Sequence, residues 1–130
     1  MDSTAGELLT GRDFRRMISG AYHAFMCEHE YINSLNVFPV PDGDTGTNLL
    51  LTLKAVVRAV DDAPDSGIGS LSKRAADNAI MGARGNSGVI LAQIFRGIAR
   101  GLAGREAASS SEVGKAFQYG ILYAYRAVAR

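Results

Sequence analysis

Two aspartates separated by a single glycine, Asp42-Gly43-Asp44, have the residue types and spacing of a site for a hard metal ion. Two prolines stiffen the chain before them, because proline fixes its own φ and favours extended backbone at the preceding residue. Gly43 lets the chain bend so that both carboxylates point to one place. Mg²⁺ is commonly held by one or two carboxylates plus phosphate oxygens. The spacing fits a magnesium-nucleotide site, and it fits equally an ordinary turn in which Asp44 or Thr45 is the N-cap of a helix.

Three oxygen-bearing residues, Thr45, Thr47 and Asn48, follow the acidic pair directly. They suit the first turn of a helix, where free backbone N–H groups and the positive end of the helix dipole favour anions. We therefore expect phosphate-binding groups beside the metal-binding acids.

A second glycine-rich stretch covers residues 82–88 and leads into an apolar helical pattern. The N–H groups of residues 85–89, with the Asn86 and Ser87 side chains, have the composition of a phosphate-binding nest, which needs the close backbone approach that Gly85 and Gly88 allow. The stretch lacks the Gly-Lys-Ser/Thr of a Walker A motif, and no strand precedes it as in a Rossmann fold. The alternative is a C-cap glycine followed by Asn86 or Ser87 as an ordinary N-cap.

The elements that position these turns can be predicted from the apolar periodicity, which indicates an all-α domain of about five helices. The helices are expected at about residues 12–28, 49–60, 70–81, 89–100 and from 112 to the chain end. Thr10 and Asp13 resemble a capping box before the first helix, and Ser70 is the expected N-cap of the third. The series from Phe14 is widened by Met17, Tyr22 and Met26, which we assign to the core. Val113, Ala116, Phe117, Gly120, Ile121 and Ala124 form the expected inner face of the last helix.

Length and composition indicate one globular domain at residues 10–130, preceded by a flexible arm at residues 1–9. The chain has 130 residues, of which 47% are apolar and 21% charged, with a net charge of +1. This charge gives no reason to expect nucleic acid or an anionic membrane as a partner. A single cysteine, Cys27, and the absence of an apolar run of about 18 residues predict a cytoplasmic protein without a membrane span. His23 and His29 lack the spacing of paired metal ligands.

With these two turns in this order, the chain resembles the nucleotide-binding L domain of the dihydroxyacetone kinase family. The likeness rests on residues 34–48 and 81–91 and is greatest to the fatty acid kinase A-subunit branch. The resemblance implies a barrel of eight amphipathic helices with Mg-ATP at one rim, of which this chain would hold about five. It implies that Asp42 and Asp44 hold Mg²⁺. The residues expected to contact the nucleotide and its phosphates are Thr45, Thr47, Asn48, Gly85, Asn86, Ser87 and Gly88.

The chain departs from the family pattern at two places. The dihydroxyacetone branch has a further metal-binding aspartate five positions before the first acid of the motif, where this chain has Val37 with Asn36 beside it. We therefore expect Asn36 or water as the third ligand. The family domain also continues through three further helices, so we expect the domain in this chain to be incomplete at its carboxyl end. An open apolar inner face would favour self-association.

The resemblance implies an ATP-dependent kinase that transfers a phosphoryl group to the carboxylate of a fatty acid. A separate fatty-acid-binding protein presents the acid in that branch, and the product is an acyl phosphate. Three alternatives stay open at this point: a dihydroxyacetone-type kinase subunit, a non-catalytic helical module that binds nucleotide or metal, and a plain helical interaction domain.

Overall fold

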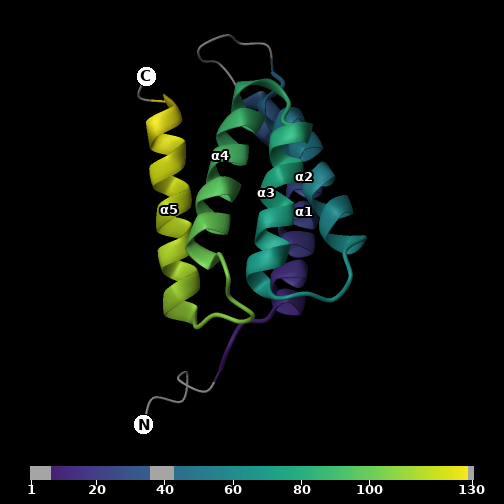
Figure 1. Cartoon of the computed structure of the whole chain (residues 1–130). Helices are drawn as coiled ribbons and strands as arrows, with labels where there is room; N and C mark the ends of the chain where they lie inside the picture. Colours follow the sequence, from purple (N-terminus) through teal and green to yellow (C-terminus); the bar gives the residue numbers. More distant parts are fainter. Residues whose placement is uncertain (1–6, 36–42, 129–130) are drawn as a thin grey trace.

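The computed structural model describes residues 7–35 and 43–128, and these residues form five helices. They are α1 (Gly11–Ser34), α2 (Thr45–Asp61), α3 (Ile68–Gly82), α4 (Gly85–Leu102) and α5 (Ser110–Val128). Successive helices run in opposite directions and lie side by side (Figure 1). The described residues contain no strand, only an isolated bridge between Leu9 and Ala108. The all-α prediction is confirmed for this part of the chain.

Two of the helices begin with a reciprocal cap. At the start of α1, Asp13 N–H donates to Thr10 Oγ1 at 3.2 Å and Thr10 N–H donates to Asp13 Oδ2 at 2.8 Å. Ser109 and Glu112 repeat this exchange before α5, at 2.9 and 3.2 Å. Each pair satisfies N–H groups that have no partner inside the helix. The predicted capping box at Thr10 is confirmed, and Ser109 caps α5 in the same way.

The start of α3 differs from the prediction, because Ser70 is not its N-cap. The helix begins at Ile68, two residues earlier. Ile68 N–H and Gly69 N–H donate to the carbonyls of Glu106 and Arg105, at 3.0 and 2.9 Å. A loop distant in sequence thus satisfies the first N–H groups of α3, and a local side-chain cap is not needed.

The first helix is longer and less buried than its sequence suggested. It continues to residue 34 instead of 28. Phe14 and Ile18 are buried, and Tyr22 packs partly buried against the core. Met17 and Met26 remain 39% and 48% exposed, so their assignment to the core was wrong. Among the described residues, the buried side chains of α1 all lie in its first half, and Phe25 in the second half is only partly buried against the core.

The central core is built mainly from the facing sides of α1 to α4, and Val113 and Ala116 of α5 complete it. Its largest fully buried apolar side chains are Val56, Val60, Ile68, Leu71 and Leu102. Their transfer from water is the main favourable term in folding. Within the described residues, every helix falls short of the length or the apolarity that crossing a membrane would require.

The last helix lies at the edge of the bundle and packs mainly on α4 (Figure 1). The two backbones approach closely at Gly97 and Gly120, where a Cβ added to either glycine would overlap the opposite helix. Phe117 and Ile121, which were expected to face inward, are 41% and 64% exposed. They were wrongly placed because periodicity shows which residues share a face but not how many neighbours cover that face.

Candidate functional site

Both glycine-rich turns lie at one end of the bundle, where α2 and α4 begin (Figure 1). Ser87 Oγ lies 3.4 Å from the backbone oxygen of Thr45 and donates to it. The Asn48 side chain lies against Gly85 so closely that a Cβ on this glycine would overlap the Asn48 amide nitrogen. Two motifs that lie far apart in the sequence are therefore in direct contact.

A single buried hydroxyl, that of Thr52, joins the two helix starts. It donates to the Asn48 carbonyl at 2.8 Å and accepts from Arg84 N–H at 3.1 Å. Thr52 is fully buried. A Cβ on Gly88 would overlap the same hydroxyl oxygen, so a glycine is required there for α4 to approach α2. Sequence reasoning missed Thr52, although a polar residue on an otherwise apolar helix face was its signal.

The beginning of α4 has the geometry of an anion-binding helix start. Gly85 has a φ of +65°, a backbone conformation that disfavours a side chain. The first N–H groups of a helix have no partner within it and point out of its end. Asn86 and Ser87 lie inside this first turn, and α4 begins at Gly85 instead of Val89. The alternative in which Asn86 or Ser87 is the N-cap is therefore wrong.

The start of α2 is held against α1 by a pair of hydrogen bonds. Thr47 N–H donates to Asn33 Oδ1 at 2.9 Å, and Asn33 Nδ2 donates to Thr47 Oγ1 at 2.8 Å. Gly46 leaves room for the His29 carbonyl, which a Cβ would overlap. The side chain of Thr47 thus positions α2. Asn33 was also missed, because it lies in the part of α1 that the apolar pattern did not predict.

The proposed metal ligands fall partly outside the described residues, since Asp42 and Asn36 are not among them. Asp44 stands at the N-cap position of α2, and its side chain makes no capping hydrogen bond. It is exposed to solvent. Residues 7–35 and 43–128 contain no group of three or more His, Cys, Asp or Glu side chains close enough to hold a metal. The metal site therefore stays a prediction.

Taken together, the described residues bring Thr45, Asn48, Gly85 and Ser87 into one contact region at two helix starts. Two helix N-termini beside one another favour negative charge, and glycine gives access to their N–H groups. A family model described as the DAK2 domain matches residues 39–130, which include both turns. The chain belongs to the DAK2 domain family.

Curated proteins from several bacteria are similar to this DAK2 chain. An uncharacterized protein of Staphylococcus epidermidis is 41% identical over 120 residues. Protein YloV of Bacillus subtilis and an uncharacterized protein of Staphylococcus aureus are each 40% identical over 120 residues. Each alignment covers 92% of this chain and 22% of the relative. The chain thus spans about a fifth of the length of the curated relatives it matches.

Proposed function

We propose that this DAK2 domain binds Mg-ATP between its two turns and serves phosphoryl transfer to the carboxylate of a fatty acid. A separate fatty-acid-binding protein would present the acid, and the product would be an acyl phosphate. The observation that carries the proposal is the direct contact between the starts of α2 and α4, at Ser87 with Thr45 and at Asn48 with Gly85. One nucleotide could touch both turns only if they were adjacent.

The residues present fit the group that the family implies. Carboxylates and amide oxygens suit Mg²⁺, and Asp42, Asp44 and Asn36 supply these donor types. Bound magnesium would neutralise charge on the phosphate oxygens. The start of α4 offers N–H donors to phosphate, and Gly85 keeps them accessible because it has no side chain.

In this reaction the chain would mainly position the reactants and stabilise charge, and it would form no covalent bond to them. Phosphoryl transfer proceeds with charge spread over the oxygens of the transferred group, so oriented N–H donors stabilise it where it develops. The α4 start, with Asn86 and Ser87, is the part of this chain suited to that role. The acceptor oxygen comes from the substrate, and no side-chain nucleophile is required.

The acceptor separates two versions of this function. The amino-acid sequence of residues 34–48, with Val37 in place of an aspartate, favours the fatty acid acceptor. The DAK2 family match itself favours dihydroxyacetone as the second candidate. Incubation with ATP and either a fatty-acid-loaded carrier protein or dihydroxyacetone distinguishes them. Acyl phosphate is trapped by hydroxylamine as a hydroxamate, whereas dihydroxyacetone phosphate is not.

Calorimetric titration with ATP, with and without Mg²⁺, tests the binding step. We expect magnesium-dependent binding that Asp44→Ala weakens about tenfold or more, as for other changes in a metal site. Asp61→Ala is the matched control, because Asp61 is an exposed aspartate at the opposite end of α2. Binding that is absent from the unsubstituted chain, or equally weakened by both substitutions, would refute the nucleotide site.

A further inference from the structure

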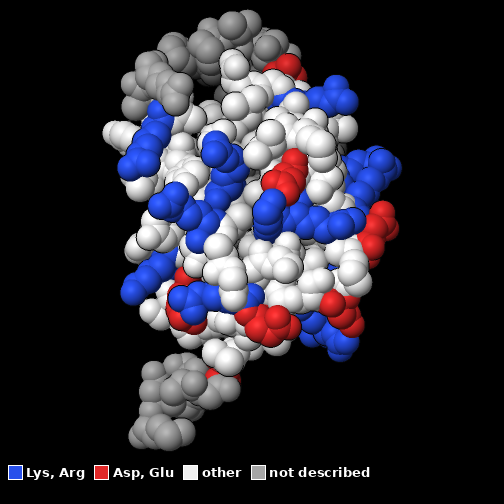
Figure 2. Space-filling view, viewed as in Figure 1, with Lys and Arg blue, Asp and Glu red and all other residues white. Residues whose placement is uncertain are grey.

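Positive charge gathers on the face formed by α3, α4 and α5 (Figure 2). Helix α4 contains Arg96 and Arg100 and no acidic residue. Arg126 on α5 adds to the same face and borders one of the hollows that lie there. Lys73 on α3 borders the other hollow, where it pairs at 3.0 Å with Asp77, the acidic residue of its wall. The whole chain has a net charge of only +1. Residues 68–128, which form α3 to α5, contain eight basic and three acidic residues, so most of the excess positive charge belongs to these helices.

The same face is hollowed into what we call the basic groove. Two adjoining hollows of about 430 and 410 Å³ share Arg96 and Tyr123 in their walls. Small residues, among them Ala76, Ala99 and Ala103, line the larger hollow. Along α4 the groove extends from Gln93 to Ala103, which is roughly 15 Å of helix. The groove is long and open, and the small side chains in the wall of its larger hollow leave space between the arginines for another chain.

The guanidinium groups in the basic groove are oriented but not neutralised. Arg100 Nη1 donates to Tyr123 Oη at 3.3 Å. The Arg96 guanidinium carbon lies 5.6 Å from the centre of the Tyr123 ring, and its Nη1 donates to Gln93 Oε1 at 3.0 Å. Among the described residues, the ion pairs are formed by other basic groups and leave Arg96, Arg100 and Arg126 without a carboxylate. Arginine presents a planar fork that pairs with carboxylates through two hydrogen bonds.

We propose that the basic groove binds an acidic helical segment of a separate protein. Arg96 and Arg100 are four residues apart, so they lie one above the other on α4. Glutamates four residues apart on a facing helix have the same spacing and match both guanidinium groups. A helix of about ten residues spans the roughly 15 Å of the groove. The small side chains of the lining leave room for its backbone.

The proposed docking does not depend on the proposed kinase function. Ten residues of α4, roughly 15 Å, separate Arg96 from Asn86 at the nucleotide turn. The variants that test the groove leave both glycine-rich turns unchanged, so ATP binding can be measured on the same samples. Loss of peptide binding with ATP binding retained, or the reverse, identifies which proposal fails.

Fluorescence anisotropy with two labelled peptides tests the proposal. The first is a helix-forming peptide of about 15 residues of alanine and glutamate, with glutamates four residues apart, and the second has glutamine in their place. We expect the glutamate peptide to bind, with affinity falling as salt is added, and the glutamine peptide to bind at least about tenfold more weakly.

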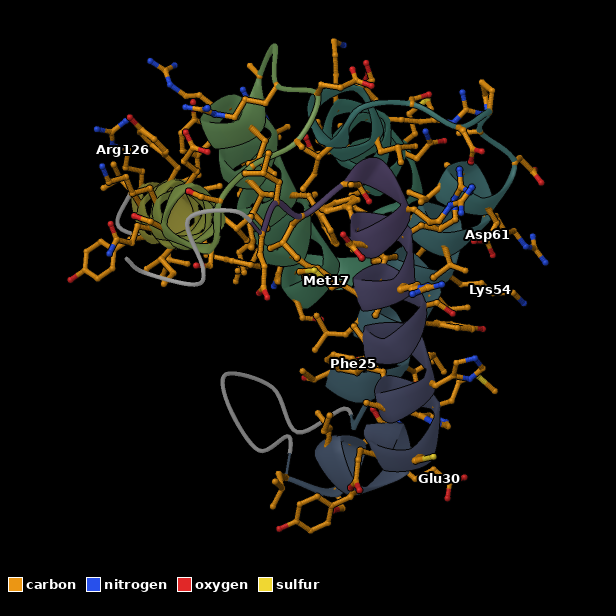
Figure 3. The ribbon with its side chains drawn as sticks, turned by 90° about the horizontal axis from the view of Figure 1, so that it is seen from below. Met17, Phe25, Glu30, Lys54, Asp61 and Arg126 are labelled. Atoms are coloured by element: carbon orange, nitrogen blue, oxygen red, sulfur yellow. The ribbon has the colours of Figure 1, made fainter. Side chains whose placement is uncertain are left out.

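Charge reversal on each side of the molecule supplies the matched variants. The double variant Arg96→Glu with Arg100→Glu should bind the glutamate peptide about tenfold or more weakly. It should instead bind a peptide with lysine in place of each glutamate. Lys54→Glu with Arg58→Glu makes the same change in net charge on α2. Lys54 lies on the opposite side of the molecule from Arg126 (Figure 3). This control should leave peptide affinity within about twofold.

Several results would overturn the proposal. They are equal binding of the glutamate and glutamine peptides, equal weakening by both double variants, or tighter binding of a short DNA duplex than of the glutamate peptide. Self-association that the Arg96 and Arg100 substitutions abolish would assign the groove to a second copy of this chain instead. If the charge-reversed variant does not fold by circular dichroism, Arg96→Gln with Arg100→Gln replaces it, with the same expected direction.

Discussion

The hydroxyl of Thr52, in the middle of α2, accepts a hydrogen bond at 3.1 Å from the backbone N–H of Arg84, the residue that precedes α4. The same oxygen donates to the Asn48 carbonyl one turn earlier. A buried N–H group without an acceptor is costly, so this contact holds the two helix starts in register. The distance between the two glycine-rich turns therefore depends in part on a side chain that belongs to neither.

Replacing Thr52 with valine should destabilise the fold by about 1–3 kcal/mol, because Arg84 N–H loses its buried acceptor. We also expect weaker ATP binding. Thr52→Ser is the control, because it keeps the hydroxyl and loses one buried methyl group, at a cost of about 1 kcal/mol. Urea unfolding and ATP titration measure both effects. If valine and serine reduce ATP affinity equally, the hydrogen bond is not what positions the turns.

Replacing Gly88 with alanine should destabilise the fold, because the new methyl group overlaps the Thr52 hydroxyl. An overpacked site of this kind costs about 1–3 kcal/mol. Gly114→Ala is the matched control: a Cβ there has open space around it and should stabilise α5 by about 1 kcal/mol. In the double variant Gly88→Ala with Thr52→Ala, part of the loss should be recovered. Strict additivity of the two free energies would contradict the overlap.

Replacing Asn33 with alanine removes both hydrogen bonds that hold Thr47. We expect the free energy of unfolding to fall by about 1–3 kcal/mol. Amide hydrogen exchange should be faster in the first turn of α2, because α1 no longer holds it. Asn78→Ala is the control, because Asn78 makes an exposed bond to Arg74 within its own helix. The assignment fails if exchange at residues 45–48 is unchanged in the Asn33 variant.

Asp65 should make part of the stability depend on pH. The hydrogen bond from Arg15 and the nearby charge of Arg12 lower the pKa of its carboxyl group in the folded state. The unfolded pKa is about 3.9, so this contribution is complete above roughly pH 5 and is lost as pH falls through the lower folded pKa. Urea unfolding at neutral and acidic pH measures the loss. Asp65→Asn should flatten this dependence, whereas Asp62→Asn, in the same loop, should not.

The helices themselves were largely predictable, because apolar spacing and caps such as Thr10 with Asp13 are local signals. The errors share a cause outside the local sequence. Ser70 was misplaced as a cap because carbonyls of a distant loop satisfy the start of α3. Met17 and Met26 were placed in the core because periodicity cannot tell a covered apolar face from an exposed one.

The candidate site divides in the same way. Gly85, Ser87 and Asn48 could be selected from residue type and spacing, because phosphate binding favours small residues and donors at helix starts. Thr52 and Asn33 were harder to select, since the partners that give them their role, Arg84 and Thr47, lie in other parts of the chain. A sequence shows the groups that suit a ligand more readily than the residues that hold those groups in place.

Helix α5 attaches to the rest of the fold almost wholly through α4, with the close approach of Gly97 and Gly120 at its centre. The side chains whose hydrogen bonds hold the two glycine-rich turns, Asn33, Thr52 and Ser87, belong to α1, α2 and α4. A displacement of α5 along α4 would leave these hydrogen bonds in place and move one wall of the basic groove, which includes Tyr123. Any change that shifts α5 should thus alter the proposed peptide binding and leave the proposed nucleotide binding unchanged.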